Sequence, residues 1–129
     1  MKTILIGYGN QASEYAKIFK KENINITGIC VNKKISKKAI DFKKKFLVEN
    51  IFTNIKTCLK NADYDCVFVF LPWDVIEKKI FEIIKYSKKT IFAEKPIALS
   101  HKNLNKIVKY KKKYNNSVFV LYNRRYFNK

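Results

Sequence analysis

Hydrophobic and polar positions alternate along this chain with two periods. Short apolar runs typical of buried strands are separated by longer stretches in which apolar residues recur every three or four positions, as on one face of a helix. In the stretch 11–20, for example, Ala12, Tyr15, Ala16 and Phe19 fall on one side. The pattern predicts strands at 3–6, 24–31, near 51, 65–71, 90–93 and 118–122, and helices at 11–20, 36–46, about two turns from 54, 74–86 and 100–114.

Strands and helices in single file predict an α/β fold. The run 65–71 is apolar on both faces, as expected for a central parallel strand. Alternating strands and helices with right-handed crossovers give a doubly wound parallel sheet of the Rossmann type. A length of 129 residues, of which 47% are hydrophobic, suits one domain over 1–129 with a real core.

The charge is large but carries little specific information. The chain has 28 Lys plus Arg against 10 Asp plus Glu, a formal net charge of +18, and only Arg124 and Arg125 are arginines. Ile and Asn are also abundant, which indicates a coding bias, and recognition of phosphates or bases usually favours the arginine fork. We interpret the lysines mainly as solvated helix faces. Non-specific attraction to polyanions remains an alternative, and specific nucleic-acid binding is not expected.

The cysteines and the apolar runs indicate a soluble cytoplasmic domain. Cys30, Cys58 and Cys66 have no CxxC spacing, which argues against a disulfide framework or a metal site. The longest uncharged apolar run, 66–73, is far too short to span a membrane, and the N-terminus enters a strand without room for a signal peptide.

A glycine turn lies between the first strand and the first helix. In the segment Gly7-Tyr8-Gly9-Asn10-Gln11-Ala12, the first glycine permits a tight turn and the second lets the backbone approach a pyrophosphate. The helix that follows offers free N–H groups to phosphates. A simple connecting turn is the alternative, but two of the chain's three glycines fall here with the spacing of a dinucleotide site.

The end of the second strand bears on the choice between NAD and NADP. An acidic residue there would bind the ribose hydroxyls of NAD, whereas basic residues would accommodate the 2′-phosphate of NADP. The sequence has Val31-Asn32-Lys33-Lys34, with no acid before Asp41. This favours NADP only slightly, because lysine is so common in the chain.

Two further segments follow predicted strands at the edge where ligands of such sheets bind. Leu71-Pro72-Trp73 closes the fourth strand, and Ala93-Glu94-Lys95-Pro96-Ile97-Ala98-Leu99-Ser100 follows the fifth. A Glu-Lys pair there could hold an ammonium group near a substrate. Taken alone, a Glu-Lys-Pro segment is more often a solvated loop.

Together with Tyr122-Asn123-Arg124-Arg125-Tyr126, these motifs resemble the glucose–fructose oxidoreductase / inositol dehydrogenase / MocA (Gfo/Idh/MocA) family over essentially the whole chain. The resemblance implies that a hydride moves between a nicotinamide cofactor, NAD or NADP, and a sugar, sugar-nucleotide or cyclitol. Lys95 matches the family's catalytic lysine, although an unperturbed lysine is an incomplete acid–base apparatus near pH 7. The cofactor-binding positions that the resemblance implies are Gly7, Gly9, Asn10, Gln11, Asn32, Lys33, Leu71, Pro72, Trp73, Glu94, Asn123 and Arg124.

The sequence also departs from the family pattern. Ile76 stands where family members often carry a histidine, and His101, the chain's one histidine, is expected at the surface. The second α/β domain of the family, which supplies most of the substrate pocket and a catalytic histidine, is not expected within 129 residues. We therefore expect a truncated or split cofactor-binding half that is catalytically incomplete by itself.

Its expected partners are a dinucleotide and either a separately encoded substrate domain or a second copy bound through the surface around Pro96 and 122–127. A stand-alone dinucleotide-binding or regulatory module without catalysis is the alternative. A basic protein that binds polyanions ranks third.

Overall fold

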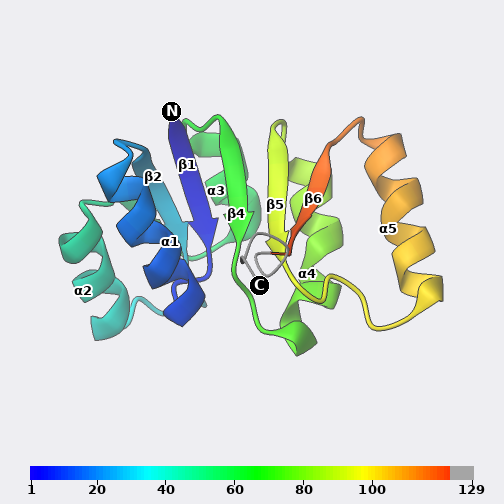
Figure 1. Ribbon diagram of the computed structural model, residues 1–129, viewed down its shortest axis with the longest axis horizontal. Helices are drawn as coiled ribbons and strands as arrows, with labels where there is room; N and C mark the ends of the chain where they lie inside the picture. The colour runs from blue at the N-terminus through cyan, green and yellow to red at the C-terminus, as the bar shows by residue number, and fades with distance from the viewer. Residues whose placement is uncertain (123–129) are drawn as a thin grey trace, which may run out of the picture.

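The computed structural model describes residues 1–122, which form a six-stranded sheet with the strand order β3-β2-β1-β4-β5-β6 (Figure 1). All five strand pairings are parallel. The strands are β1 (Lys2–Ile6), β2 (Asn25–Cys30), β3 (Asn50–Phe52), β4 (Cys66–Val69), β5 (Thr90–Glu94) and β6 (Val118–Leu121). The helices are α1 (Asn10–Lys21), α2 (Lys37–Phe46), α3 (Ile55–Asn61), α4 (Trp73–Tyr86) and α5 (His101–Lys113). The predicted doubly wound Rossmann-type sheet is confirmed.

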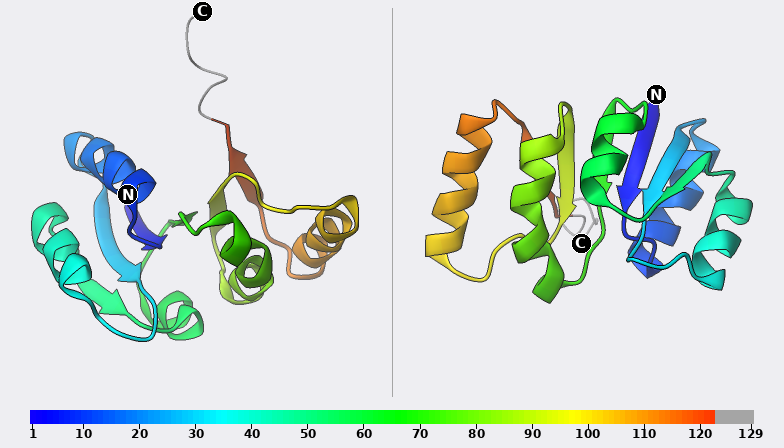
Figure 2. Two further views of the ribbon diagram at one scale, coloured as in Figure 1. Left: turned by 90° about the horizontal axis from the view of Figure 1, so that it is seen from below. Right: turned by 180° about the vertical axis from the view of Figure 1, so that it is seen from behind.

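Two apolar cores lie on the two faces of the sheet. Helices α1 and α2 pack on one face, and α3, α4 and α5 pack on the other, as the view onto the carboxyl edge shows (Figure 2, left). The core under α1 and α2 is rich in phenylalanine. The core under α3, α4 and α5 is built around four fully buried isoleucines of α4, namely Ile76, Ile80, Ile83 and Ile84. No helix among residues 1–122 is long and apolar enough to cross a membrane.

Element ends follow from local chemistry. Ser36, Asn54 and Ser100 precede α2, α3 and α5, and each side chain accepts a hydrogen bond from the backbone N–H three residues later. The strand expected over 65–71 is shorter: β4 ends at Val69, and Pro72 is the cap residue of the helix that follows. Trp73, expected to close that strand, is instead the first residue of α4.

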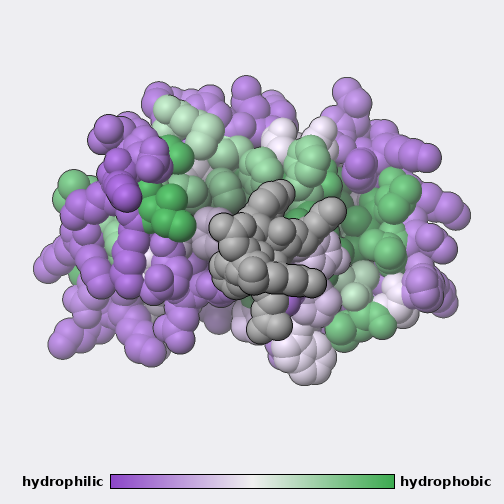
Figure 3. Space-filling model, viewed as in Figure 1, coloured by the Kyte–Doolittle hydropathy of each residue, from purple (hydrophilic) through white to green (hydrophobic). Residues whose placement is uncertain are grey.

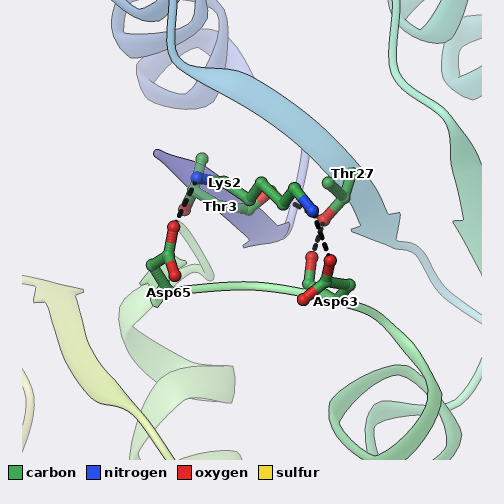
Figure 4. Close-up of polar contacts among 5 residues, drawn as sticks. All are labelled: Lys2, Thr3, Thr27, Asp63 and Asp65. Atoms are coloured by element: carbon green, nitrogen blue, oxygen red, sulfur yellow. Dashed lines mark hydrogen bonds and ion pairs between the residues drawn. The ribbon is translucent and has the colours of Figure 1, made fainter.

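A polar network ties the amino ends of the central strands together (Figure 4). The Lys2 backbone N–H donates to the Asp65 carboxylate at 2.8 Å, and the Lys2 ammonium group pairs with Asp63. The Thr27 hydroxyl donates to the Asp63 carbonyl oxygen at 2.7 Å. These contacts lie at the edge opposite the carboxyl ends, so they brace the sheet without occupying the edge where ligands bind.

No helix among residues 1–122 covers one corner of the sheet, formed by β5 and β6. On the α1 and α2 side, Phe68, Phe92 and Phe119 stack across β4, β5 and β6 with ring centroids 4.9 and 5.6 Å apart. Exposure rises along this row: Phe68 is 8% exposed and Phe119 is 55% exposed. Hydrophobic residues accordingly show at the surface between two hydrophilic flanks (Figure 3). The sequence pattern predicted helices on both faces but not that this corner lacks one.

Candidate functional site

A cleft of about 780 Å³ opens at the carboxyl edge of the sheet. It lies where β1 and β4 are neighbours, and the helices that follow these two strands cover opposite faces of the sheet. Such a switch point is where open α/β sheets bind ligands. The cleft is lined by the β1–α1 turn, the end of β2, one face of α2 and the start of α4, together with Ile55, Phe70 and Glu94.

Gly7 makes the β1–α1 turn possible. Its φ of +98° lies in the region that favours glycine, and a Cβ atom there would stand 2.4 Å from the carbonyl oxygen of Phe70. The Gly7 N–H donates to the Cys30 carbonyl oxygen at 3.0 Å, which joins the turn to the end of β2. The glycine is therefore required by the fold itself.

Gly9 has a different reason to be a glycine. Its φ of −74° is open to any residue, and a Cβ atom there would meet no atom within 4 Å. The missing side chain leaves space directly in front of the first turn of α1. Nothing in the protein requires this space, so it suits a ligand that approaches the backbone closely.

The two helices that begin at the cleft lack side-chain caps. Gly9 precedes α1 and Pro72 precedes α4, and neither contributes a capping hydrogen bond, whereas α2, α3 and α5 are all capped. The first turn of α1 also contains no acidic residue. The start of α1 therefore presents backbone N–H groups and the positive end of its dipole to the cleft, as in sites that bind phosphate, whereas α4 has Asp74 in its first turn.

The wall formed by α2 was not foreseen from the sequence. The Tyr8 hydroxyl and the Ser36 hydroxyl are hydrogen bonded at 2.8 Å, and the Tyr8 ring meets the edge of Phe42 at 6.4 Å between centroids. These contacts hold α2 beside the glycine turn, so its residues Lys38, Asp41, Phe42, Lys45 and Phe46 line the cleft. The only sequence signal was the helical period of α2, which does not show which element packs against it.

Glu94 is the last residue of β5 and the acidic residue at the far wall of the cleft. Burial raises the pKa of its carboxyl group above the usual range, while the N–H and the ammonium group of Lys95 oppose this rise. Burial also raises the pKa of Tyr15 on α1, and the charge of Glu94 adds to that effect. A half-buried carboxyl group whose hydrogen-bonding capacity the protein uses only in part can accept hydrogen bonds from a ligand.

The structure brings most of the predicted site residues together. Eight of them line the cleft: Gly7, Gly9, Asn10, Gln11, Asn32, Leu71, Pro72 and Glu94. Lys33, Trp73 and Lys95 are exposed and do not line it, and Trp73 is 59% exposed. Asn123 and Arg124 lie outside the described residues. His101 is exposed at the start of α5, as expected, and Ile76 is buried in the core.

The cleft has features that fit a dinucleotide. Gly9 leaves room for a ligand to approach the backbone, and the uncapped start of α1 supplies donors for a pyrophosphate. Asn32 and Glu94 lie at the two ends of the lining and offer polar groups for two riboses. Within residues 1–122, no three His, Cys, Asp or Glu side chains gather as a metal site would require.

Several solved structures with the same fold are dehydrogenases. The scyllo-inositol dehydrogenase of Lactobacillus casei, solved with NAD(H) and scyllo-inositol, matches 99% of this chain with a TM-score of 0.83 and 20% identity. The WlbA dehydrogenase of Chromobacterium violaceum, solved with NADH and UDP-GlcNAcA, matches 98% with a TM-score of 0.84 and 19% identity. The chain spans 38% and 36% of these two proteins, respectively. No curated protein matches the sequence.

A family model gives the assignment that these structures alone do not. It describes an oxidoreductase family with an NAD-binding Rossmann fold and matches residues 1–122. The match covers the glycine turn and the Glu94-Lys95-Pro96 segment. The chain therefore belongs to the Gfo/Idh/MocA family of oxidoreductases, in which it corresponds to the NAD-binding Rossmann domain.

Proposed function

We propose that this chain binds a nicotinamide dinucleotide across the carboxyl edge of its sheet and serves as the cofactor-binding part of a sugar or cyclitol oxidoreductase. The observation that carries the proposal is the uncapped start of α1, where Gly9 leaves open space for a pyrophosphate. Titration with NADH and NADPH, followed by protein fluorescence or calorimetry, tests it. Saturable binding is expected, and no binding of either dinucleotide would refute the proposal.

In this proposal, each part of the cleft holds one part of the cofactor. Backbone N–H groups of Gly9, Asn10 and Gln11 bind the pyrophosphate, Leu71 and Pro72 border the cofactor, and Glu94 accepts from the nicotinamide ribose. The bound nicotinamide supplies or receives a hydride. Lys95 stands next to Glu94 and is the candidate for contact with the substrate hydroxyl. Lys33, Trp73, Asn123 and Arg124 complete the proposed set of cofactor contacts.

We further propose a preference for NADP over NAD. The end of β2 offers Asn32 and Lys33 to the adenosine ribose, and Lys38 lines the same side of the cleft from α2. Two ammonium groups here would attract a 2′-phosphate. A lower dissociation constant for NADPH than for NADH is expected, and the difference should shrink in Lys38→Ala. Tighter binding of NADH would contradict this preference.

Catalysis by this chain alone is not part of the proposal. The proposed acid–base residue, Lys95, is exposed and lies outside the cleft lining. The same observation favours the second candidate function, a dinucleotide-binding or regulatory module without catalysis. A search for NAD(P)-linked turnover of sugars, sugar nucleotides and cyclitols, with and without a separately encoded α/β partner, separates the two. Turnover restored by such a partner supports a split oxidoreductase.

We propose that another protein surface covers the bare corner of the sheet, formed by a second copy or by a separate substrate domain. Phe119 is 55% exposed there, and among residues 1–122 no strand pairs with the outer edge of β6. Sedimentation at increasing protein concentration tests the second-copy form. A strictly monomeric protein at all concentrations would exclude it.

Finally, we propose that the protein works in a reducing compartment such as the cytoplasm. Cys30, Cys58 and Cys66 are buried thiols in the two apolar cores. Alkylation of the denatured protein, without reductant, should modify three thiols. A disulfide in protein isolated from its cell would contradict this.

A further inference from the structure

The segment between β5 and α5 holds the two residues on which the proposed function depends most after the glycine turn. Glu94 ends the strand, Lys95 follows it, and α5 begins only at His101. Within this segment, Ile97 is 8% exposed and packs in the apolar core beneath α4 and α5, so one side chain anchors the middle of the segment. The polar side of the segment is held by a residue of another helix.

That residue is Glu77, which lies just over one turn into α4. One of its carboxylate oxygens accepts a hydrogen bond from the Asn103 side-chain amide at 2.7 Å, and the other accepts from the Leu99 backbone N–H. The two donors lie on either side of Ser100, the residue that caps α5. These two hydrogen bonds, called the Glu77 clip below, therefore hold the end of the Glu94–Ser100 segment and the start of α5 against α4.

The helix that supplies this clip also begins at the cleft. Pro72, just before α4, and Val75, in its first turn, line the cleft on one side. Glu94 lines it on the other side, from the end of β5. We propose that Glu77 is a positioning residue: by fixing this segment to α4, its carboxylate sets the distance between the start of α4 and Glu94, and so shapes the nicotinamide side of the dinucleotide site. This inference rests on the proposed function.

A positioning role makes a prediction that a general contribution to stability does not. The clip lies on the nicotinamide side of the cleft, whereas the glycine turn and Asn32 form the pyrophosphate and adenosine sides. Loss of the Glu77 carboxylate should therefore weaken binding of NADH, which occupies both sides, and leave binding of ADP unchanged. A variant that merely lowered the population of folded protein would weaken both ligands equally.

The test compares Glu77→Ala with Glu77→Gln and with the control Glu14→Ala, which removes an acid at the same position of α1, paired with Lys17 at 2.9 Å, where neither residue lines the cleft. For Glu77→Ala, we expect a dissociation constant for NADH that rises on the order of tenfold, as when a residue that orients a ligand contact is lost, with no change for ADP. Glu77→Gln retains one acceptor oxygen and should fall between. Glu14→Ala should match the wild type.

Hydrogen exchange supplies a readout that needs no ligand. The Leu99 amide should exchange faster in Glu77→Ala than in Glu14→Ala, because its acceptor has gone. Equal weakening of NADH and ADP, or unchanged NADH affinity, would overturn the positioning role. If the wild type binds neither ligand, the proposed function fails and the positioning role with it, while exchange at Leu99 still decides whether the clip itself exists.

Discussion

At the scale of single residues, the two glycines of the β1–α1 turn show how one motif serves both folding and binding. Gly7 is needed because its φ is +98° and its Cα lies against the Phe70 carbonyl group. Gly9 has an ordinary φ and open space where a side chain would be. The sequence shows both as glycines, and only the structure separates the position required for stability from the position left open for a ligand.

Replacement of Gly7 should therefore destabilise the protein. Gly7→Ala would force a methyl group to 2.4 Å from the Phe70 carbonyl oxygen at a positive φ. We expect a loss of about 2–4 kcal/mol in the free energy of unfolding, because both the clash and the backbone strain oppose folding. Urea unfolding followed by circular dichroism measures it. A loss below about 0.5 kcal/mol, the usual range of surface substitutions, would contradict the geometry of the turn.

Glu94 gives a prediction about pH. Burial raises the pKa of this carboxyl group in the folded protein, so the folded state holds its proton more tightly than the unfolded chain. Stability from this group is present below the unfolded pKa, about 4.3, and is lost as the pH rises through the folded pKa. Glu94→Gln should therefore stabilise the protein at pH 7.

The gain from Glu94→Gln should shrink as the pH is lowered through the folded pKa, because the wild-type carboxyl group then takes up a proton. Unfolding curves of both proteins between pH 4 and 7 check this. A difference that stays constant across this range, or a variant that is less stable at pH 7, would show that burial does not dominate at this site.

At the scale of elements, the connection from α5 to β6 depends on one amide side chain. Asn116, which is 9% exposed, donates to the carbonyl oxygens of Ile84 and Ser87 at 3.1 and 2.9 Å, at the end of α4. These bonds fix the end of α4 to the start of β6, the edge strand of the sheet.

Removal of this amide should loosen the β6 side of the sheet. Asn116→Ala leaves two carbonyl groups without their donor, and we expect a loss of about 1–3 kcal/mol in the free energy of unfolding. The exposed Asn105 of α5 offers a matched control, because Asn105→Ala removes an amide of the same size at the surface. Equal stability of the two variants in thermal or urea unfolding would argue against the bridge.

The sequence predicted elements well where the signal is local. Ser36 and Ser100 lie where their helices begin, and the helical period of α4 identified its buried isoleucines. The boundary at Trp73 was wrong because β4 ends at Val69 and α4 begins directly after Pro72, whose fixed φ is compatible with a helix start. Contacts between distant elements had no local signal. The cleft wall from α2 and the clip made by Glu77 depend on how helices pack, which a single sequence does not show.

At the scale of the whole molecule, the fold places its features on separate surfaces. The polar network of Lys2 and Asp63 lies at one edge of the sheet, the cleft lies at the opposite edge, and the stacked phenylalanines occupy a bare corner of one face. The Rossmann domain of the family is thus present, with a cleft at the carboxyl edge of its sheet. Most of the lysines behind the +18 charge lie on the helices, and the charge gives a long-range attraction for any phosphate-bearing ligand.

The central claim is that the open space at Gly9 is a pyrophosphate site, and one measurement tests it most directly. NADH and NADPH are titrated into the wild type and into Gly9→Ala, with urea unfolding of both as the control. Because a Cβ at this position meets no protein atom within 4 Å, we expect equal stability but dinucleotide binding weakened by on the order of tenfold or more. Unchanged affinity in a stably folded Gly9→Ala protein would contradict the account.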